Sequence, residues 1–431
     1  MLQVNEKYIT ECLETNNLGN GICKIDGMVV FVKGALKGEK LEIIIKELHK
    51  KYAIASINKI IISSKNRIES KCDCYDKCGG CCFLHCNIEE ENEIKTNYIK
   101  EVLRKNKIAA EVENISTPIA ENYRNKAILF FNGQRFGYLE ENTNNIVPHT
   151  DCIVNDKLIE KIVKFSEENL LYKENLTGIF IRVNSNDDKE ALVCPIYNKE
   201  VDIEEYANKI RNAFKEKINV FYSVCNEEKI VFNKTNVKLV IGGDYIEDEI
   251  CGLNIQISPK SFYQINHDCA GSLYRKVLEL IEVKEGDLIA DLFCGTGTIG
   301  LIVGKNKQVN VIGIEIEKEA INDALKNSVN NRIGNVKFLC DDASNLKEKV
   351  SVCIIDPPRN GCSISMIKTL KRLLPKEIVY VSCNIDTFAR DYLLLQDNYE
   401  IQSHIYPFNM FPRTSHVETV ALLTLNPSVK K

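Results

Sequence analysis

A glycine-rich turn between an apolar run and a helix is the first sign of chemistry in this 431-residue chain. Residues 288–290 predict a buried strand, and a Cys-Gly-Thr-Gly turn precedes a helix that begins near Thr298. Gly295 and Gly297 would let a ligand approach the backbone closely, as in nucleotide sites. The turn lacks the Gly-Lys-Ser/Thr ending of a phosphate loop and the third glycine of a dinucleotide site, which disfavours ATP and GTP. Taken alone, a plain tight turn would explain it equally well.

Acidic residues lie at the ends of the strands predicted after this turn. Further apolar runs at 309–316, 336–340, 351–355 and 377–382 alternate with helical patterns, which predicts a parallel sheet covered on both faces. Ligands of such sheets bind at the carboxyl ends of the strands. Glu315 ends the second strand and is placed to accept hydrogen bonds from a ribose diol. The same edge is expected to receive Asp291, Asp342, Asp356 and Cys383.

A cysteine and a glutamate at strand ends suggest covalent chemistry. Cys383 follows the strand at 377–382 and is a candidate nucleophile, although cysteine is often simply a buried residue and the chain has 18. Glu418 lies in a polar segment that opens an apolar strand, and it is a candidate general base. His416 is a weaker candidate base, for which a partly exposed strand position without a catalytic role is the simpler interpretation.

A dense group of cysteines near the N-terminus predicts metal or iron–sulfur ligation. Six occur within residues 72–86, and in a reducing compartment such a group favours ligation over disulfides. Thiolates suit zinc as well as iron–sulfur clusters. Two ligand sets fit the spacing: Cys74 and Cys78 with Cys81 or Cys82, or alternatively Cys72, Cys78 and Cys81.

The N-terminal segment predicts a small barrel. Short strand-like runs at 22–24, 28–32, 41–46 and 52–61 are separated by glycines, as in oligonucleotide-binding barrels. The chain carries a net charge of −4, yet residues 1–71 hold 12 Lys and Arg against 8 Asp and Glu. This local excess is compatible with RNA, although a solvated lysine-rich surface would look the same.

The middle of the chain is expected to form a separate unit. A helix is predicted over 88–105, and residues 123–255 are mostly strand-like with one helix near 203–217. We divide the chain into domains at 1–60, 61–255 and 256–431. The N-terminus has no apolar signal region and no run reaches membrane-spanning length, which predicts a cytoplasmic protein without a membrane partner.

Several motifs resemble known families. The segments DLFCGTG, GIEI, CDDA and DPPR, in this order, resemble class I S-adenosylmethionine-dependent methyltransferases. GNGICKIDGMVVFVKGALKGEKLEI resembles a TRAM domain, an RNA-binding barrel. Across the whole chain, the C-x5-C-x2-C spacing and the segments YRNK, SPKSFYQIN, VSCN and HVETVALL are similar to RNA uracil-5-methyltransferases. The most similar members are the cluster-containing enzymes that act on 23S rRNA.

This resemblance implies an α/β fold of three parts. They are an N-terminal OB-like (TRAM) barrel, a central α+β iron–sulfur domain, and a class I Rossmann-like methyltransferase domain. It also implies a [4Fe–4S] cluster, with Cys152 in PHTDCIV as a distant fourth ligand beside Cys72, Cys78 and Cys81. Zinc is the second possibility, and the roles of Cys74, Cys82 and Cys86 stay open.

The resemblance further implies the roles of the site residues. Phe262 would stack on a flipped-out base and Gln264 would hydrogen-bond base or cofactor. Cys383 would add to carbon 6 of uracil, and Glu418 would remove the carbon 5 proton. Arg359 stands where amino-methylating enzymes have an aromatic residue, which disfavours an exocyclic amine as acceptor. S-adenosylmethionine would be held by Gln264, Phe293, Thr298, Glu315, Asp342 and Asp356.

Other functions fit the same residues less well. Transfer RNA uracil-5-methyltransferases share the catalytic half but would lack the barrel and cluster, so 23S rRNA is the first expected substrate. Cytosine-5 methylation also uses a cysteine adduct, but usually from another position in the fold. A non-catalytic RNA-binding iron–sulfur protein is disfavoured because Cys383, Glu418, Asp356, Gln264 and Glu315 are all present. The protein is expected to act as a monomer.

Overall fold

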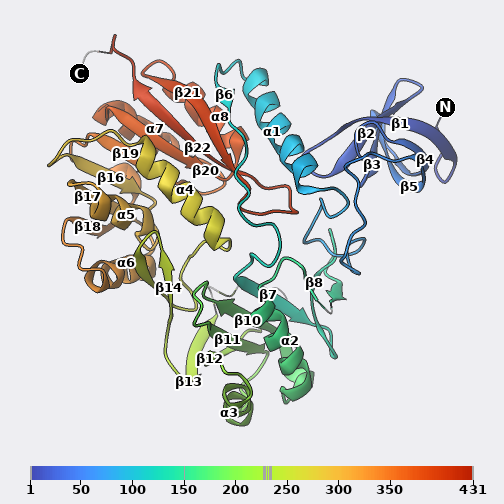
Figure 1. Cartoon of the computed structure of the whole chain (residues 1–431), viewed down its shortest axis with the longest axis horizontal. Coiled ribbons are helices and arrows are strands. Elements are labelled where there is room, and N and C mark those ends of the chain that lie inside the picture. The colour runs from blue at the N-terminus through green and yellow to red at the C-terminus, as the bar shows by residue number, and fades with distance from the viewer. Residues whose placement is uncertain (1, 150, 227–229, 231, 233–234, 430–431) are drawn as a thin grey trace.

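The structure is a computed structural model that describes residues 2–149, 151–226, 230, 232 and 235–429. It has a small barrel at the N-terminal end, a mixed sheet in the middle of the chain and a large C-terminal sheet (Figure 1). In Figure 1 the barrel projects to one side, and helix α1 lies between it and the C-terminal sheet.

The barrel is closed by five strands in the order β1-β2-β3-β5-β4. Its inward side chains alternate with outward ones, as the strand period requires, and Val30, Val32, Ile43 and Ile45 are fully buried. The sequence correctly predicted a barrel but did not predict its first strand. The strands are β1 (Lys7–Thr15), β2 (Asn20–Ile25), β3 (Met28–Lys33), β4 (Lys40–Leu48) and β5 (Tyr52–Ile62).

The central sheet has seven strands in the order β13-β12-β11-β10-β7-β8-β9. Helices α2 (Lys157–Asn169) and α3 (Glu204–Ala213) pack on one face. The other face joins the C-terminal core through the hairpin of β14 (Ile246–Ile250) and β15 (Leu253–Ile257). The strands are β7 (Lys126–Phe131), β8 (Phe136–Leu139), β9 (Ile146–Pro148), β10 (Leu176–Val183), β11 (Glu190–Tyr197), β12 (Lys217–Val224) and β13 (Asn236–Ile241).

Helix α2 corrects the expectation of a single helix in this region. Its residues include β-branched Ile and Val, which favour strands. Their spacing is helical, however, because Leu158, Ile159, Ile162 and Val163 share one buried face. The Asp156 side chain caps the helix by accepting from the Leu158 amide at 2.8 Å. The predicted helix near 203–217 is also shorter, since α3 ends at Ala213.

The C-terminal sheet has eight strands in the order β18-β17-β16-β19-β20-β22-β21-β6. Strands β16 to β20 are parallel, as predicted, and β22 inserts antiparallel between β20 and β21. The strands are β16 (Leu288–Leu292), β17 (Asn310–Glu315), β18 (Val336–Cys340), β19 (Val352–Ile355), β20 (Glu377–Ser382), β21 (Tyr399–Phe408), β22 (Glu418–Leu425) and β6 (Glu111–Val112).

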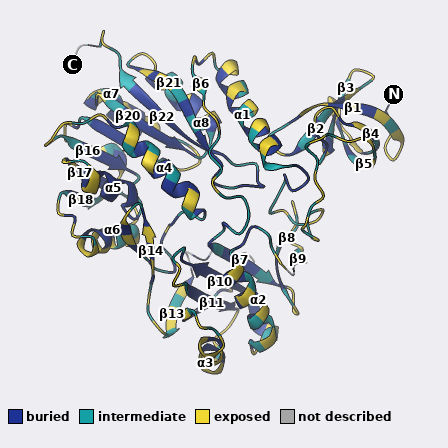
Figure 2. Ribbon diagram, in the orientation of Figure 1, coloured by how far each residue is buried: buried dark blue, intermediate teal, exposed yellow. Residues whose placement is uncertain are grey.

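Helices cover both faces of this sheet, which explains its almost continuous apolar strands. Helices α4, α5 and α6 share one hydrophobic core with one face of the sheet, and α1, α7 and α8 share a second core with the other face. Figure 2 shows the strands dark blue while the helices keep exposed outer faces. The helices are α1 (Ile88–Lys105), α4 (His267–Leu280), α5 (Thr298–Asn306), α6 (Lys318–Asn330), α7 (Ile364–Leu373) and α8 (Ile385–Leu395).

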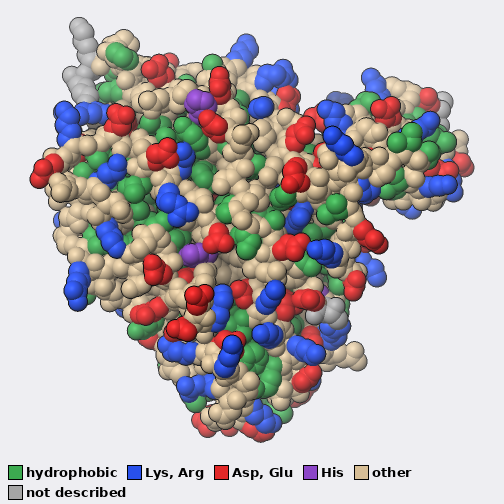
Figure 3. Space-filling model, in the orientation of Figure 1, with side chains coloured by type: hydrophobic (Ala, Val, Ile, Leu, Met, Phe, Trp, Pro, Cys, Tyr) green, Lys and Arg blue, Asp and Glu red, His purple; other side chains and the backbone are tan. Residues whose placement is uncertain are grey.

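Helix α1 matches the predicted range 88–105, but its location was not predicted. It packs on the C-terminal sheet, and β6 pairs with β21 at the edge of that sheet. None of the described helices is long and apolar enough to cross a membrane. Figure 3 shows Lys and Arg side chains interspersed with Asp and Glu over the visible face.

Candidate active site

The ends of β20 and β22 bring together the predicted nucleophile and base. The antiparallel register pairs Ser382 with Thr419. Cys383 follows Ser382 just beyond the end of β20, and Glu418 is the first residue of β22. The two groups are close enough for the charge of Glu418 to raise the pKa of the Cys383 thiol. The insertion of β22 next to β20 therefore places a thiol beside a carboxyl group.

Glu418 is a buried acid with a strongly raised pKa. Its side chain is buried at the start of β22. Burial, together with the negative charge of Asp356, raises the Glu418 pKa to about 8, and Arg359 opposes this shift. A carboxyl group with a pKa near neutral pH is suited to proton transfer.

The Cys383 thiol lies in the same electrostatic environment. Burial and the charges of Glu418 and Asp356 raise its pKa to about 11, whereas the Arg359 guanidinium lowers it. Arg359 donates towards His416, with 3.4 Å between Nη2 and Nε2. Burial and Arg359 lower the pKa of His416, which keeps this ring neutral and leaves it a weak competitor for the base role.

A second pocket lies at the glycine turn. Gly297 has a φ of 76°, and a Cβ there would lie 2.4 Å from Phe338 Cζ, so the turn requires glycine. Of the predicted cofactor contacts, those that line the pocket are Phe293, Thr298, Gln264 and Asp356, and Phe262 stands at its exposed rim.

Glu315 lies at the edge of this pocket, whereas Asp342 does not line it. Glu315 reaches it through the turn, because its Oε2 accepts from the Gly295 amide at 3.2 Å. Asp342 is exposed and caps a short 3-10 turn, accepting from the Ser344 amide at 2.8 Å. The structure therefore brings Glu315 to the pocket edge, while Asp342 is not among the residues that line it.

Buried acids line the pocket floor. Burial raises the pKa of Asp291 to about 7, with the charges of Asp356 and Glu315 adding to the shift, although Asp291 accepts from the Gly300 amide at 2.8 Å. Burial also raises the pKa of Asp356 to about 7. Carboxyl groups with pKa values near 7 are partly ionised at neutral pH, and a bound cation would favour their ionised forms.

The segment 258–266 is fixed by the central sheet. Arg182 in β10 donates to the Ser261 carbonyl at 2.8 Å, and Asn125 donates to the Gln264 carbonyl at 3.0 Å. The exposed Phe262 ring and the Gln264 amide thus project from a backbone that is anchored on both sides. The central domain positions residues of the C-terminal site in this way.

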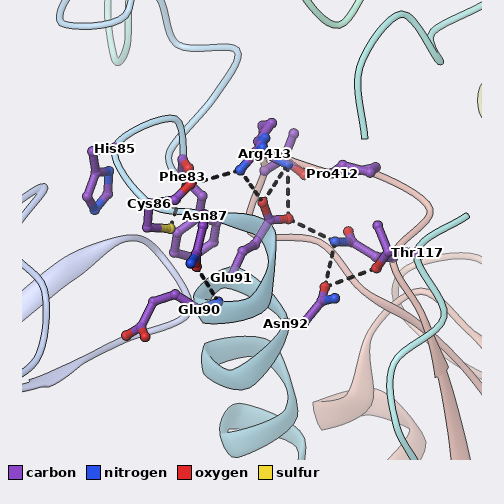
Figure 4. A network of polar contacts seen from close by, with 12 residues as sticks. Phe83, His85, Cys86, Asn87, Glu90, Glu91, Asn92, Thr117, Pro412 and Arg413 are labelled. Atoms are coloured by element: carbon purple, nitrogen blue, oxygen red, sulfur yellow. Dashed lines mark hydrogen bonds and ion pairs between the residues drawn. The ribbon is translucent and has the colours of Figure 1, made fainter. Parts of the chain in front are cut away.

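A buried ionic network fixes the segment that leads into Glu418 (Figure 4). Glu91 of α1 accepts from Lys95 Nζ at 2.8 Å and from the Arg413 amide at 2.9 Å. Lys95 also donates to Asn409 Oδ1 at 2.7 Å. Glu91, Lys95 and Asn409 are fully buried. Because the charges are paired and hydrogen-bonded, the network ties residues 409–413 to α1.

Residues 409–413 are also hydrogen-bonded to the cysteine-rich region. The Arg413 carbonyl accepts from the Cys82 amide at 2.7 Å, and Arg413 Nη1 donates to the Cys86 carbonyl at 3.0 Å. Residues 82–86 are therefore connected through Arg413 to the strand that carries Glu418.

The predicted ligands Cys72, Cys78, Cys81 and Cys152 line one small pocket together with Tyr75, Leu84, Arg124 and Tyr138. The structure thus brings Cys152 to the other three, across at least 71 residues of sequence. Among the described residues, however, no group of three or more His, Cys, Asp or Glu side chains has an arrangement that could hold a metal ion. Cys74 donates instead to the Pro148 carbonyl, and Cys86 is buried.

Two features of the site had no sequence signal. Tyr263 and Tyr274 line the glycine-turn pocket, but an aromatic residue at helix α4 or within an irregular segment looks like an ordinary core residue. The exposed barrel residue Leu18 lines a cavity with Cys383, which only the packing of the barrel against the C-terminal sheet reveals.

Comparison with known proteins assigns the family. The family model described as tRNA (Uracil-5-)-methyltransferase matches residues 87–351 and 342–426, and the TRAM domain model matches residues 12–57. The chain is 34% identical to an uncharacterised RNA methyltransferase of Caldanaerobacter subterraneus subsp. tengcongensis, over 98% of this chain and 99% of the relative. It is 32% identical to one of Clostridium tetani, over 96% of this chain and 95% of the relative.

A solved structure extends the comparison to the whole fold. The crystal structure of the Pyrococcus abyssi tRNA (uracil-54, C5)-methyltransferase, in complex with S-adenosyl-L-homocysteine, superimposes with a TM-score of 0.79 at 27% identity. The match covers 96% of this chain and 99% of that one. The chain therefore belongs to the RNA uracil-5-methyltransferase family and carries an N-terminal TRAM domain.

Proposed function

We propose that the protein transfers a methyl group from S-adenosylmethionine to carbon 5 of uridine in RNA through a covalent Cys383 adduct. The observation that supports this proposal is the pairing of Ser382 with Thr419, which are the direct chain neighbours of Cys383 and Glu418. Nucleophilic catalysis on a pyrimidine needs a thiol and a base close to the same ring, and the charge of Glu418 acts on the Cys383 thiol.

The chemistry assigns one task to each residue. Carbon 5 of uracil is too weak a nucleophile to accept a methyl group unaided. The Cys383 thiolate forms a bond to carbon 6, which moves electron density into an enolate and makes carbon 5 reactive. S-adenosylmethionine supplies the methyl group. Glu418 then takes the carbon 5 proton, the double bond re-forms and the carbon–sulfur bond breaks, which restores the thiolate.

Arg359 supports both steps by its charge. It lowers the pKa of Cys383 and of Glu418, so it favours the ionised forms that the two steps require. The Glu418 pKa of about 8 implies that the base form increases as the pH rises through this value.

For the cofactor, we propose the pocket at the glycine turn. Phe293, Thr298, Gln264 and Asp356 would contact S-adenosylmethionine, and Glu315 would hold its ribose. The S-adenosyl-L-homocysteine complex of the Pyrococcus abyssi relative supports this proposal. Asp342 would act from the exposed rim, next to the end of β18. Phe262 and Gln264 would receive the extruded base.

We also propose that Cys72, Cys78, Cys81 and Cys152 hold a [4Fe–4S] cluster. Four thiols around one largely apolar pocket are the donor set that such clusters use. Bound cluster would join residues 72–81 to residue 152, and its role through Arg413 would be to stiffen the segment before Glu418.

For the RNA, we propose 23S rRNA as the first candidate, because the cysteine motif is similar to that of the cluster-containing 23S rRNA enzymes. A tRNA substrate is the second candidate, and the Pyrococcus abyssi enzyme favours it. That enzyme's structure is matched over 99% of its length by this chain, barrel included, so the presence of a barrel does not separate the two classes.

Incubation with methyl-labelled S-adenosylmethionine tests the proposal. Unmodified 23S rRNA and tRNA transcripts are supplied separately, and the digested nucleosides are analysed by mass spectrometry. We expect 5-methyluridine in one transcript and none with Cys383→Ala. Label in 5-methylcytidine or in an adenosine, or no label in either transcript with cofactor bound, would contradict the proposal.

A further inference from the structure

Two cavities meet where the barrel touches the C-terminal domain. One, of about 460 Å³, extends from the barrel residues Asn20 and Lys33 to His416. The other, of about 250 Å³, reaches Cys383. Arg359, Ser415 and His416 line both, so the two cavities are neighbours along one seam that ends at the nucleophile.

One barrel side chain also lines both cavities. Leu18 lies on the turn between β1 and β2 and keeps 57% of its surface exposed. The turn is internally fixed, because Asn16 Oδ1 accepts from the amides of Leu18 and Asn20 at 3.0 Å each. Single exposed leucines are common on protein surfaces. This one is unusual because a rigid turn holds it at the entrance to the Cys383 cavity.

The turn is packed directly against the cysteine-rich region. Gly19 has a φ of 77°, and a Cβ at this position would lie 2.5 Å from the Cys82 carbonyl oxygen. Cys82 in turn donates to the Arg413 carbonyl at 2.7 Å. The location of Leu18 is therefore fixed relative to the segment that leads to Glu418.

The chemistry of the seam suits a single RNA strand. Arg359 is exposed, and among the described residues no carboxylate lies within ion-pair distance of its guanidinium, which leaves it available to a phosphate. His416 and Tyr98 add planar rings that can stack on bases. Extruding a base also leaves a gap in the strand, and nucleic-acid-binding proteins fill such gaps with apolar side chains.

We propose that the RNA strand next to the target uridine runs through this seam and that Leu18 packs against the bases flanking the extruded uridine. The barrel turn would then determine which RNA context is accepted, a role beyond general RNA affinity. This inference rests on the proposed RNA methylation, and its test is designed so that the two can fail separately.

The first test compares Leu18→Ala with Leu13→Ala. Leu13 is 54% exposed on the same barrel but lines neither cavity, so it is a matched control. The substrates are the folded transcript that the wild-type protein methylates and a short unstructured oligonucleotide with the same uridine. Loss of an apolar contact of this size predicts that Leu18→Ala lowers kcat/KM about tenfold on the folded RNA. The loss on the oligonucleotide should be smaller, and S-adenosylmethionine affinity should match the control.

The second test moves the turn without changing Leu18. Gly19→Ala is compared with Gly27→Ala, since Gly27 has a similar φ of 84° but a Cβ there would meet nothing within 4 Å. Both variants carry the same backbone strain, and their thermal stability is measured. Only Gly19→Ala should lower kcat/KM on the folded RNA.

The outcomes separate the two proposals. Absence of 5-methyluridine with wild-type protein would contradict the proposed function. Normal wild-type methylation with Leu18→Ala equal to Leu13→Ala, or with equal losses on folded and unstructured RNA, would overturn the role of Leu18. Equal effects of Gly19→Ala and Gly27→Ala would overturn the role of the turn.

Discussion

The proposed catalytic pair, Cys383 and Glu418, and the pocket of four cysteines are built in opposite ways. Cys383 and Glu418 lie at the ends of β20 and β22, two strands whose register is fixed by six residue pairs. Residues 63–87, all of which the structure describes, form turns but no helix or strand. They are held by scattered contacts, among them the hydrogen bonds from Cys82 and Phe83 to the Arg413 carbonyl and the ion pair of Arg67 with Glu39 in the barrel. A site on a sheet is preorganised by the fold, whereas a site on turns depends on what it binds.

The largest effect is expected at the sheet-based pair. Cys383→Ala should abolish methyl transfer and any covalent RNA adduct, a loss of at least about a thousandfold. Glu418→Gln should still form the adduct and transfer the methyl group, and should then stall because the carbon 5 proton remains. Denaturing gels should show a protein–RNA band for Glu418→Gln and none for Cys383→Ala.

The amide is close in size to the carboxylate, so lost basicity rather than lost packing would explain the stall. Normal turnover of Glu418→Gln without a trapped band would refute its assignment as base, and His416 would be tested next.

The pocket of four cysteines, which lies on turns, should instead be tested by whether it binds iron. Anaerobically purified protein should be brown with about four iron atoms per chain. Cys152→Ala should lose this iron, whereas Cys340→Ser should keep it, because Cys340 is exposed at the end of β18. Iron analysis and visible absorption measure both. Stoichiometric zinc without iron, or iron retained in Cys152→Ala, would contradict the assignment.

The connection between the two regions can be broken at Glu91. Glu91→Gln leaves Lys95 and Arg413 without their buried counter-charge, so the free energy of unfolding should fall by roughly 3–5 kcal/mol. Glu101→Gln on the same helix is the control, because its pair with Arg104 is exposed and should contribute less than about 1 kcal/mol. Denaturant unfolding compares the variants, and equal midpoints would show that the network does not stabilise the fold.

A substitution at Glu315 tests the proposed cofactor pocket at the glycine turn. Removal of a charge-assisted hydrogen bond costs roughly 1.5–3 kcal/mol, so Glu315→Ala should weaken S-adenosylmethionine binding about ten- to a hundredfold. Glu319→Ala, in the first turn of α6, should bind normally. Calorimetric titration measures both, and unchanged affinity in Glu315→Ala would locate the ribose elsewhere.

The smallest expected effect is the pH dependence of S-adenosylmethionine binding that the acidic residues Asp291 and Asp356 would cause. Asp291 and Asp356 have pKa values of about 7, and the sulfonium of S-adenosylmethionine favours their ionised forms. Its affinity should therefore fall roughly three- to tenfold as the pH drops from 8 to 6. S-adenosyl-L-homocysteine carries no sulfonium and should show a flatter dependence. Parallel pH profiles of the two ligands, measured by calorimetry, would contradict this coupling.

The candidate site residues could be predicted from the sequence, whereas their arrangement in space could not. The strand–turn–helix pattern and its acidic strand ends could be recognised from local spacing, and so could the helix at 88–105. That Cys383 faces Glu418 depends on β22 entering the sheet between β20 and β21, which local pattern does not determine. The network at Glu91 joins residues 318 positions apart in the chain, and Asn409 carries no sequence mark of this role.

Helix α2 is absent from the sequence-based prediction for a different reason. Its Ile and Val residues favour strands individually, and only their spacing and the Asp156 cap indicate a helix. The contact of Leu18 with the Cys383 cavity depends on how two separate parts pack, and a single exposed leucine carries no signal of that.

The attachment of α1 to the C-terminal sheet also has a consequence for the order of folding. Lys95 bonds to Asn409, 314 residues later, so α1 can gain this partner only after residue 409 has been synthesised. Until then the apolar face of α1, with Ile99, Val102 and Leu103, lacks the C-terminal sheet, and the Glu91–Lys95 pair lacks Asn409 and Arg413. Contacts of such long sequence separation form slowly. The strands of the barrel and of the central sheet precede β20 and β22 in the chain, so they can pair before the residues of the proposed catalytic pair have been synthesised.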